Sequence, residues 1–254
     1  MSKTFALLRL PLTLLLIAEP FRNPSRDTRQ FGVSGPTIAY AVLGDSTAAG
    51  QGAPYEEGIA VMTARRLAET RIVRLTNFAV SGAKTRDVLD GQLPAAERAR
   101  PDLVLISVGA NDVTHLTSVR SVRSDIVQII RRLRAANADV VIVMTGSPDM
   151  GAPPRVPSVL RPIAAWQTRR LNRMFESVAR ANDVTFAPIA AATGPLFRRD
   201  HSLFADDRFH PNDRGYATWL PTLDRALGDA LGQCSSQRKE APLPAPRVRT
   251  SESS

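Results

Sequence analysis

Five short apolar runs, each rich in valine and isoleucine, recur along the chain and constrain the fold more than any other feature of the sequence. Their length and composition predict buried strands. The segments between them are long enough for helical crossovers, which parallel strands require. The pattern therefore predicts an α/β fold: a three-layer α/β/α sandwich around a five-stranded parallel sheet covered on both faces. The runs are Thr37–Gly44, Ile72–Phe78, Leu103–Val108, Val140–Met144 and Val184–Ile189.

Apolar side chains recur at helical spacing between these runs. Around Val119–Leu133 they repeat at intervals of three and four, with arginines on the opposite side. Similar spacing predicts a helix over Val159–Ala181 and a last one over Asp213–Leu231, which Pro221 is expected to break or kink. The formal net charge is +9, but only three of the 33 basic residues are lysines. We interpret the arginine stripe as a solvated helix face and predict no nucleic-acid partner.

The two ends of the chain differ in composition from the part that carries the strands. Residues 1–32 hold an apolar stretch over 5–18 and a basic linker, and the stretch is too short to span a membrane. It is interpreted as a peripheral element in a membrane interface, an export signal, or a helix packed on the domain. Localisation stays open between membrane-associated, exported and cytoplasmic. We expect one folded domain over 33–231 and a disordered tail over 232–254, which is rich in serine, proline and charge.

Small and polar residues follow the first three predicted strands. Ser46 lies in GDSTAAGQG, Gly82 in AVSGAKT and Asn111 in VGANDV. Each also has an ordinary interpretation, as a helix N-cap, a tight turn and part of a capped turn. In a doubly wound sheet, however, sites form outside the carboxyl ends of the strands. These three loops are therefore expected to converge on one place.

The chain has three histidines, and His210 is the candidate proton acceptor. Asp207 lies three residues earlier, within reach of the imidazole Nδ1, where a carboxylate fixes the tautomer and stabilises the imidazolium. His115 and His201 are expected to have no proton-transfer role. The scattered histidines and the single cysteine, Cys234, provide no set of metal ligands, so we expect no metal and no cofactor.

The four blocks GDSTAAGQG, AVSGAKT, VGANDV and DDRFHPN, in this order, resemble those of the SGNH, or GDSL, hydrolases. The resemblance covers about residues 37–231 and implies a flavodoxin-like sheet and an enzyme that hydrolyses carboxylic esters. It implies that Ser46 is the nucleophile, His210 the base and Asp207 its partner. It also implies an oxyanion hole formed by Gly82, Asn111 and the Ser46 backbone N–H. The G-x-S-x-G motif of the α/β-hydrolases does not occur in the chain.

The expected partner is a small-molecule ester with a short or medium acyl chain, or a lysophospholipid. Two tryptophans and three tyrosines offer few platforms for sugar stacking, so a polysaccharide substrate is disfavoured. One alternative is a deacetylase of small acetylated sugars. The alternative from a different class is a catalytically silent, membrane-associated binding module of the same fold.

Overall fold

The computed structural model describes residues 28–240, apart from the side chains of 233–240. Its centre is a six-stranded sheet in the order β1-β3-β2-β4-β5-β6. Five of these strands are parallel and lie at the predicted runs, so the predicted three-layer sandwich is confirmed, with one strand added. The five are β2 (Thr37–Gly44), β3 (Ile72–Asn77), β4 (Leu103–Ser107), β5 (Val141–Met144) and β6 (Thr185–Phe186).

The added strand, β1 (Arg29–Phe31), lies at the edge of the sheet and pairs antiparallel with β3. The predicted count of five strands was therefore one short, and the folded part begins before residue 33. A run of three residues is too short to show the alternation that marks a strand in a sequence. Its strand conformation depends on the neighbouring strand, which is a tertiary effect.

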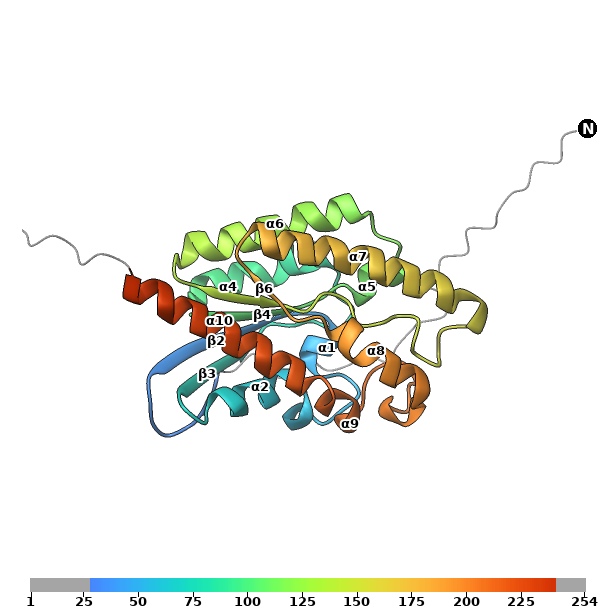
Figure 1. Ribbon diagram of the computed structural model, residues 1–254, viewed down its shortest axis with the longest axis horizontal. Coiled ribbons are helices and arrows are strands. Elements are labelled where there is room, and N and C mark those ends of the chain that lie inside the picture. Colours follow the sequence, from blue (N-terminus) through green and yellow to red (C-terminus); the bar gives the residue numbers. More distant parts are fainter. Residues whose placement is uncertain (1–27, 241–254) are drawn as a thin grey trace, which may run out of the picture.

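Helices cover both faces of the sheet (Figure 1). One face is covered by α2 (Ile59–Leu67) and α10 (Leu220–Glu240), and the other by α4 (Leu93–Ala99), α6 (Val119–Ala136) and α7 (Arg161–Ala181). The shorter helices are α1 (Ser46–Ala49), α3 (Thr85–Asp87), α5 (Ala110–Thr114), α8 (Ile189–Arg199) and α9 (Asp213–Ala217). A π-helical turn spans Val88–Gln92, and 3-10 turns span Tyr55–Glu57, Ser158–Leu160 and His201–Leu203.

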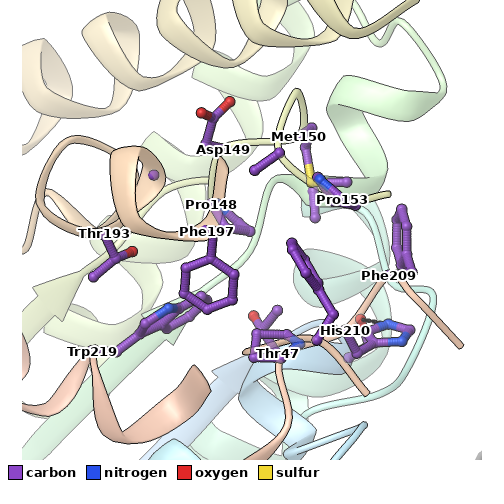
Figure 2. Close-up of a pocket in the computed structure, with 16 residues that line it drawn as sticks. Thr47, Pro148, Asp149, Met150, Pro153, Thr193, Phe197, Phe209, His210 and Trp219 are labelled. Carbon is purple, nitrogen blue, oxygen red and sulfur yellow. Dashed lines mark hydrogen bonds between the residues drawn. The ribbon is translucent and has the colours of Figure 1, made fainter. Parts of the chain in front are cut away.

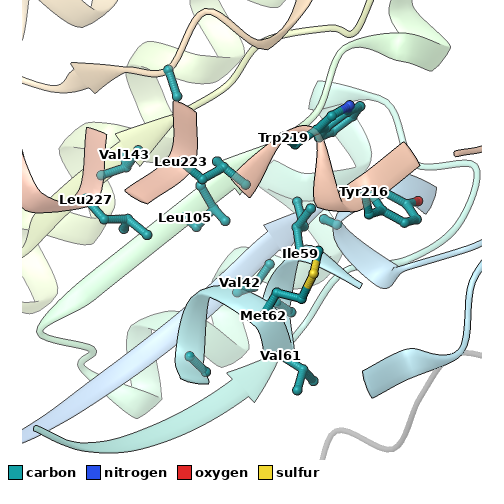
Figure 3. Packing of buried hydrophobic residues seen from close by; sticks show 14 of the residues in the cluster. Val42, Ile59, Val61, Met62, Leu105, Val143, Tyr216, Trp219, Leu223 and Leu227 are labelled. Carbon is teal, nitrogen blue, oxygen red and sulfur yellow. The ribbon is translucent and has the colours of Figure 1, made fainter. Parts of the chain in front are cut away.

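The central strands are apolar on both faces because each face packs against helices. In β2, Tyr40 and Val42 belong to one buried cluster, whereas Ala41 and Leu43 belong to the other. Consecutive residues of a strand point to opposite faces, so one run contributes to both layers. Figure 3 shows the first cluster, which side chains of α2, α10 and the sheet form together. They include Val42, Ile59, Met62, Leu105, Val143, Leu223 and Leu227.

The helical spacing read from the sequence corresponds to buried faces. In α6, Val122, Ile126, Ile129 and Leu133 are buried, and most of its arginines are exposed. In α7 the face with Leu171, Phe175 and Val178 is buried. The predicted last helix is divided into α9 and α10, and Pro221 lies in the first turn of α10. A proline is tolerated there because the first N–H groups of a helix have no partner within it.

The C-terminal prediction needs a correction. Disorder was expected from residue 232, but α10 continues to Glu240. Once a helix is nucleated, each further residue adds a hydrogen bond, and Gln, Arg, Lys and Glu extend it readily. The first proline beyond this helix is Pro242, next to where α10 ends.

The N-terminal stretch 5–18 and the tail over 241–254 lie outside the described residues. Within residues 28–240, no helix is both long and apolar enough to cross a membrane.

Candidate active site

Ser46 is the first residue of α1, and only Asp45 separates it from the end of β2. The turn depends on Gly44, whose φ is +147° and whose added Cβ would lie 1.8 Å from the Ser107 carbonyl oxygen. No other residue fits such a close backbone approach. The Asp45 side chain then accepts a hydrogen bond of 2.9 Å from the Thr47 backbone N–H and caps α1. Ser46 is therefore held at the carboxyl edge of the sheet.

The end of β2 is also held by Gln92, which the sequence analysis did not single out. The Gln92 side-chain amide donates to the Gly44 carbonyl at 2.7 Å, and its oxygen accepts from the Gly44 N–H at 2.9 Å. A buried side chain thus satisfies both backbone groups of the residue two positions before Ser46. Gln92 belongs to the π-helical turn, a distortion that is frequent near functional sites.

His210 lies in a loop that folds back on itself before α9. The Asp207 Oδ1 atom accepts hydrogen bonds from the backbone N–H groups of Phe209, at 2.9 Å, and His210, at 3.0 Å. A bridge between Phe204 and Pro211 closes the loop. The carboxylate therefore shapes the backbone that carries the imidazole.

The structure brings Ser46, His210 and Asp207 together. The distance from His210 Nε2 to Ser46 Oγ is 2.9 Å, and that from His210 Nδ1 to Asp207 Oδ2 is 2.5 Å. Ser46 and His210 are both buried. Partial burial raises the pKa of Asp207, but hydrogen bonds from the side chain and backbone of His210 outweigh it, and the pKa falls to about 2. The carboxylate is therefore ionised at neutral pH.

Gly82 and Asn111 reach the same edge from the next two loops. Gly82 has a φ of +83°, in the region that favours glycine, and an added Cβ would meet nothing within 4 Å. Backbone conformation, not space, therefore favours glycine at this position. The Asn111 side-chain amide donates a hydrogen bond of 3.1 Å to the Ala83 carbonyl. An amide nitrogen carries two hydrogens, so Asn111 can hold the Gly82 loop and still offer a second donor.

Below Ser46 lies a buried polar network that the sequence analysis also missed. The Thr47 hydroxyl donates to Asp45 Oδ1 at 2.8 Å and lies 3.1 Å from the Ser107 hydroxyl, which Thr145 contacts in turn. Burial raises the pKa of Asp45 to about 6, although the bonds from Thr47 oppose the shift. The only sequence signal for this network is that hydroxyl side chains come at the ends of successive strands.

An apolar pocket opens beside Ser46 and His210 (Figure 2). It holds about 30 Å³ of free space. Much of one wall comes from the loop after β5, whose glycines and prolines mark it in the sequence as irregular backbone. The rest comes from α1, α5 and α8, from the His210 loop and from Trp219. Its apolar side chains include Pro148, Met150, Pro153, Phe197, Phe204, Phe209 and Trp219.

The other two histidines lie outside the row of side chains formed by Ser46, His210 and Asp207. His115 and His201 are exposed, and His115 Nδ1 lies 2.8 Å from the Asn111 carbonyl oxygen. Among the described residues, no group of three or more His, Cys, Asp or Glu side chains is placed to hold a metal ion.

Comparison with known proteins settles the family. The sequence model of the GDSL-like lipase/acylhydrolase family matches residues 42–218. The chain belongs to this family. A GDSL-like esterase of Mycobacterium tuberculosis is 36% identical over 196 residues, which are 75% of this chain and 62% of that relative. The chain therefore spans less than two thirds of the relative's length.

Solved structures share the fold of this GDSL-like chain. The esterase EstA from Pseudoalteromonas sp. is 19% identical, with a TM-score of 0.59 and coverage of 77% of this chain and 99% of the esterase. Phospholipase A1 from Streptomyces albidoflavus is 20% identical, with a TM-score of 0.57 and coverage of 74% and 99%. The resemblance that the four sequence blocks indicated is thus confirmed at the level of family and fold.

Proposed function

We propose that this protein hydrolyses carboxylic esters with short acyl groups through an acyl-enzyme on Ser46. The observation that carries the proposal is the row of three side chains in which His210 joins the Ser46 hydroxyl to the Asp207 carboxylate. A neutral serine is a weak nucleophile and needs an adjacent base, and that base needs a group that orients it. This arrangement supplies both, in a member of a family of lipases and acylhydrolases.

In the first half of the reaction, Ser46 Oγ attacks the ester carbonyl carbon while His210 Nε2 takes the hydroxyl proton. The carbonyl π electrons move to oxygen and form a tetrahedral intermediate. When the carbon–oxygen bond to the alcohol breaks, the imidazolium returns its proton to the leaving alkoxide. The acyl group stays on Ser46.

In the second half, a water molecule replaces the alcohol. His210 Nε2 removes a proton from the water as it attacks the acyl carbon, and it then protonates Ser46 Oγ as the carboxylic acid leaves. Asp207 remains ionised in both halves, because its pKa of about 2 lies far below neutral pH. Its negative charge stabilises each imidazolium that forms at His210.

The oxyanion of each tetrahedral intermediate would lie between Ser46, Gly82 and Asn111. Backbone N–H groups of the first two and the second amide hydrogen of Asn111 supply the donors. These donors are already held by the fold, for Asn111 through its bond to the Ala83 carbonyl. Preorganised donors that act where charge develops contribute strongly to catalysis.

We expect Asn111→Ala to lower kcat for p-nitrophenyl acetate by about 10²-fold and to change KM little, because the lost donor acts mainly on the transition state. Steady-state kinetics measure both constants. His115→Ala, one turn along at an exposed position, is the control and should change kcat by less than about threefold. A rise in KM alone would make Asn111 a substrate contact instead.

The pocket beside Ser46 supports a short acyl group. The space that it leaves for water-sized groups is small, about 30 Å³, and this favours short acyl chains over long ones. Phenylalanine, methionine and proline side chains surround this space and favour an apolar occupant.

We expect kcat/KM for p-nitrophenyl esters to be highest from acetate to butyrate and to fall by about tenfold or more at octanoate. Met150→Ala should move the optimum to longer chains, because it removes a wall of the pocket. Met174→Ala is the matched control: Met174 is also buried but lies on α7 outside the pocket, so the order of substrates should not change. If the protein hydrolysed none of the esters in the series, the proposed function would be overturned.

A further inference from the structure

The beginning of α7, with the 3-10 turn before it, exposes a row of apolar side chains. Val159 is 78% exposed, Ile163 53% and Trp166 51%. Ile163 and Trp166 are three positions apart in α7 and so lie on the same side of the helix, away from buried residues such as Ala164 and Leu171. Val159 precedes them in the 3-10 turn, and the three exposed side chains together are called the stripe. They are half of the large apolar residues that are strongly exposed in the described part of the chain.

Arginines lie close to this stripe along the chain, and two of them, Arg169 and Arg173, also line a groove with Asp149 and Glu176. The segment from Met150 to Phe175 contains five arginines and no aspartate or glutamate. The Arg170 guanidinium stacks over the Trp166 ring, with 5.5 Å between its central carbon and the ring centroid. Such stacking keeps the cation beside the exposed indole.

An open pocket beside the stripe is lined by Arg161, Arg169, Arg198 and His201. Arg198 is paired with Asp149 at 2.7 Å, and Arg161 donates to backbone carbonyls of the loop before α7. No carboxylate side chain lines the pocket itself. Guanidinium groups arranged in this way suit a phosphate or another anionic group.

We propose that this surface, the Val159, Ile163 and Trp166 stripe with its flanking arginines, docks on an anionic phospholipid bilayer. The apolar stripe would enter the interface between headgroups and acyl chains, where tryptophan is favoured. The arginines would lie against the negative headgroups, and the open pocket would take a headgroup phosphate. The exposed apolar side chains argue against a purely electrostatic partner, such as nucleic acid.

The position of the stripe determines where the pocket beside Ser46 would lie when the protein is docked. α7 begins at the carboxyl edge of the sheet, and in Figure 1 its first turns project beyond α5 and α8. The loop that supplies Pro148, Met150 and Pro153 to the pocket beside Ser46 runs directly into Val159. Docking would therefore bring the mouth of that pocket close to the membrane. This proposal goes beyond ester hydrolysis and does not depend on the role of Ser46.

Trp166 provides a direct test with the full chain. The protein has two tryptophans, and Trp219 is fully buried, so a change in indole exposure on vesicle binding reports on Trp166. With vesicles of 70% phosphatidylcholine and 30% phosphatidylglycerol, tryptophan emission should shift to the blue and become protected from acrylamide. Vesicles of phosphatidylcholine alone, or inorganic phosphate alone, should produce neither change.

Two double variants separate the contributions of charge and apolar surface. Arg169→Gln with Arg173→Gln should weaken vesicle binding by about twentyfold, because each basic residue near an anionic surface adds its own contribution to the free energy of binding. Val159→Ser with Ile163→Ser should weaken it by about tenfold. The matched control is Arg131→Gln with Arg180→Gln. It removes the same charge near the C-terminal ends of α6 and α7, which lie toward the amino ends of the strands. This variant should bind like the wild type. Circular dichroism checks that every variant is folded.

Three results would overturn the proposal. In the first, the protein sediments with anionic vesicles but Trp166 emission does not change, which would place the contact elsewhere, for example in residues 5–18. In the second, the control variant loses as much binding as the variant at the α7 surface. In the third, the same emission change appears on concentrating the protein without lipid, which would make the stripe a contact between two copies of this chain.

Discussion

Ser46→Ala and His210→Ala should each lower kcat for p-nitrophenyl acetate by about 10⁴- to 10⁶-fold while the fold remains intact. The nucleophile and its base act as a unit, so removal of either member loses nearly the whole contribution of both. In the proposed mechanism these two members are Ser46 and His210, which one hydrogen bond of 2.9 Å between His210 Nε2 and Ser46 Oγ joins. Steady-state kinetics measure the loss, and labelling by a fluorophosphonate probe should disappear in both variants.

Matched variants show whether the loss belongs to these positions. Ser121→Ala, at an exposed serine of α6, and His201→Ala, at an exposed histidine, should keep kcat within about threefold. Both should also keep fluorophosphonate labelling. If purified Ser46→Ala retained most of the activity, the nucleophile would have been assigned wrongly. If the wild type were not labelled at all, the catalytically silent binding module would be favoured.

Asp207→Asn should be nearly as severe, with kcat about 10⁴-fold lower, whereas Asp206→Asn should change kcat by less than about threefold. An asparagine at 207 can keep the backbone bonds to Phe209 and His210, but it carries no charge and favours the wrong imidazole tautomer. Asp206 is exposed, and the contact to His210 Nδ1 is made by its neighbour. The two variants therefore test the same chemical change one position apart.

The pKa of Asp207 gives this test a second measurement. An aspartate whose pKa is lowered from 3.8 to about 2 stabilises the folded state above pH 3.8, and this contribution is lost as the pH falls through 2. Asp207→Asn removes that contribution. Its unfolding free energy should therefore differ most from that of the wild type near neutral pH and approach it in strong acid. A severe loss of activity in Asp206→Asn with normal activity in Asp207→Asn would show that the acid was assigned one position too late.

The sequence by itself determined those features of the fold and of the candidate site that depend on the local residue pattern. Each central strand is a run of apolar residues whose conformation and burial follow from its own composition, as β2 and β4 illustrate. The loops with Ser46, Gly82 and Asn111 were recognisable because each follows such a run, and parallel strands place their carboxyl ends at one edge. Asp207 and His210 are three residues apart, so their contact could also be expected from local geometry.

Only the tertiary structure decided those features of the fold and of the candidate site that depend on contacts between residues distant in the chain. Ser46 and His210 are 164 positions apart, and their distance of 2.9 Å depends on how the last loop packs against α1. Contacts between distant residues also produce the hydrogen bonds from Gln92 to Gly44 and the pairing of β1 with β3. The pocket wall likewise combines Met150, Phe197 and Trp219 from separate parts of the chain. The helix over Val159–Ala181 was expected from the sequence, but only packing showed that Val159, Ile163 and Trp166 face solvent. Side-chain burial and long-range hydrogen bonds depend on which surfaces meet, and a single sequence read locally does not contain that information.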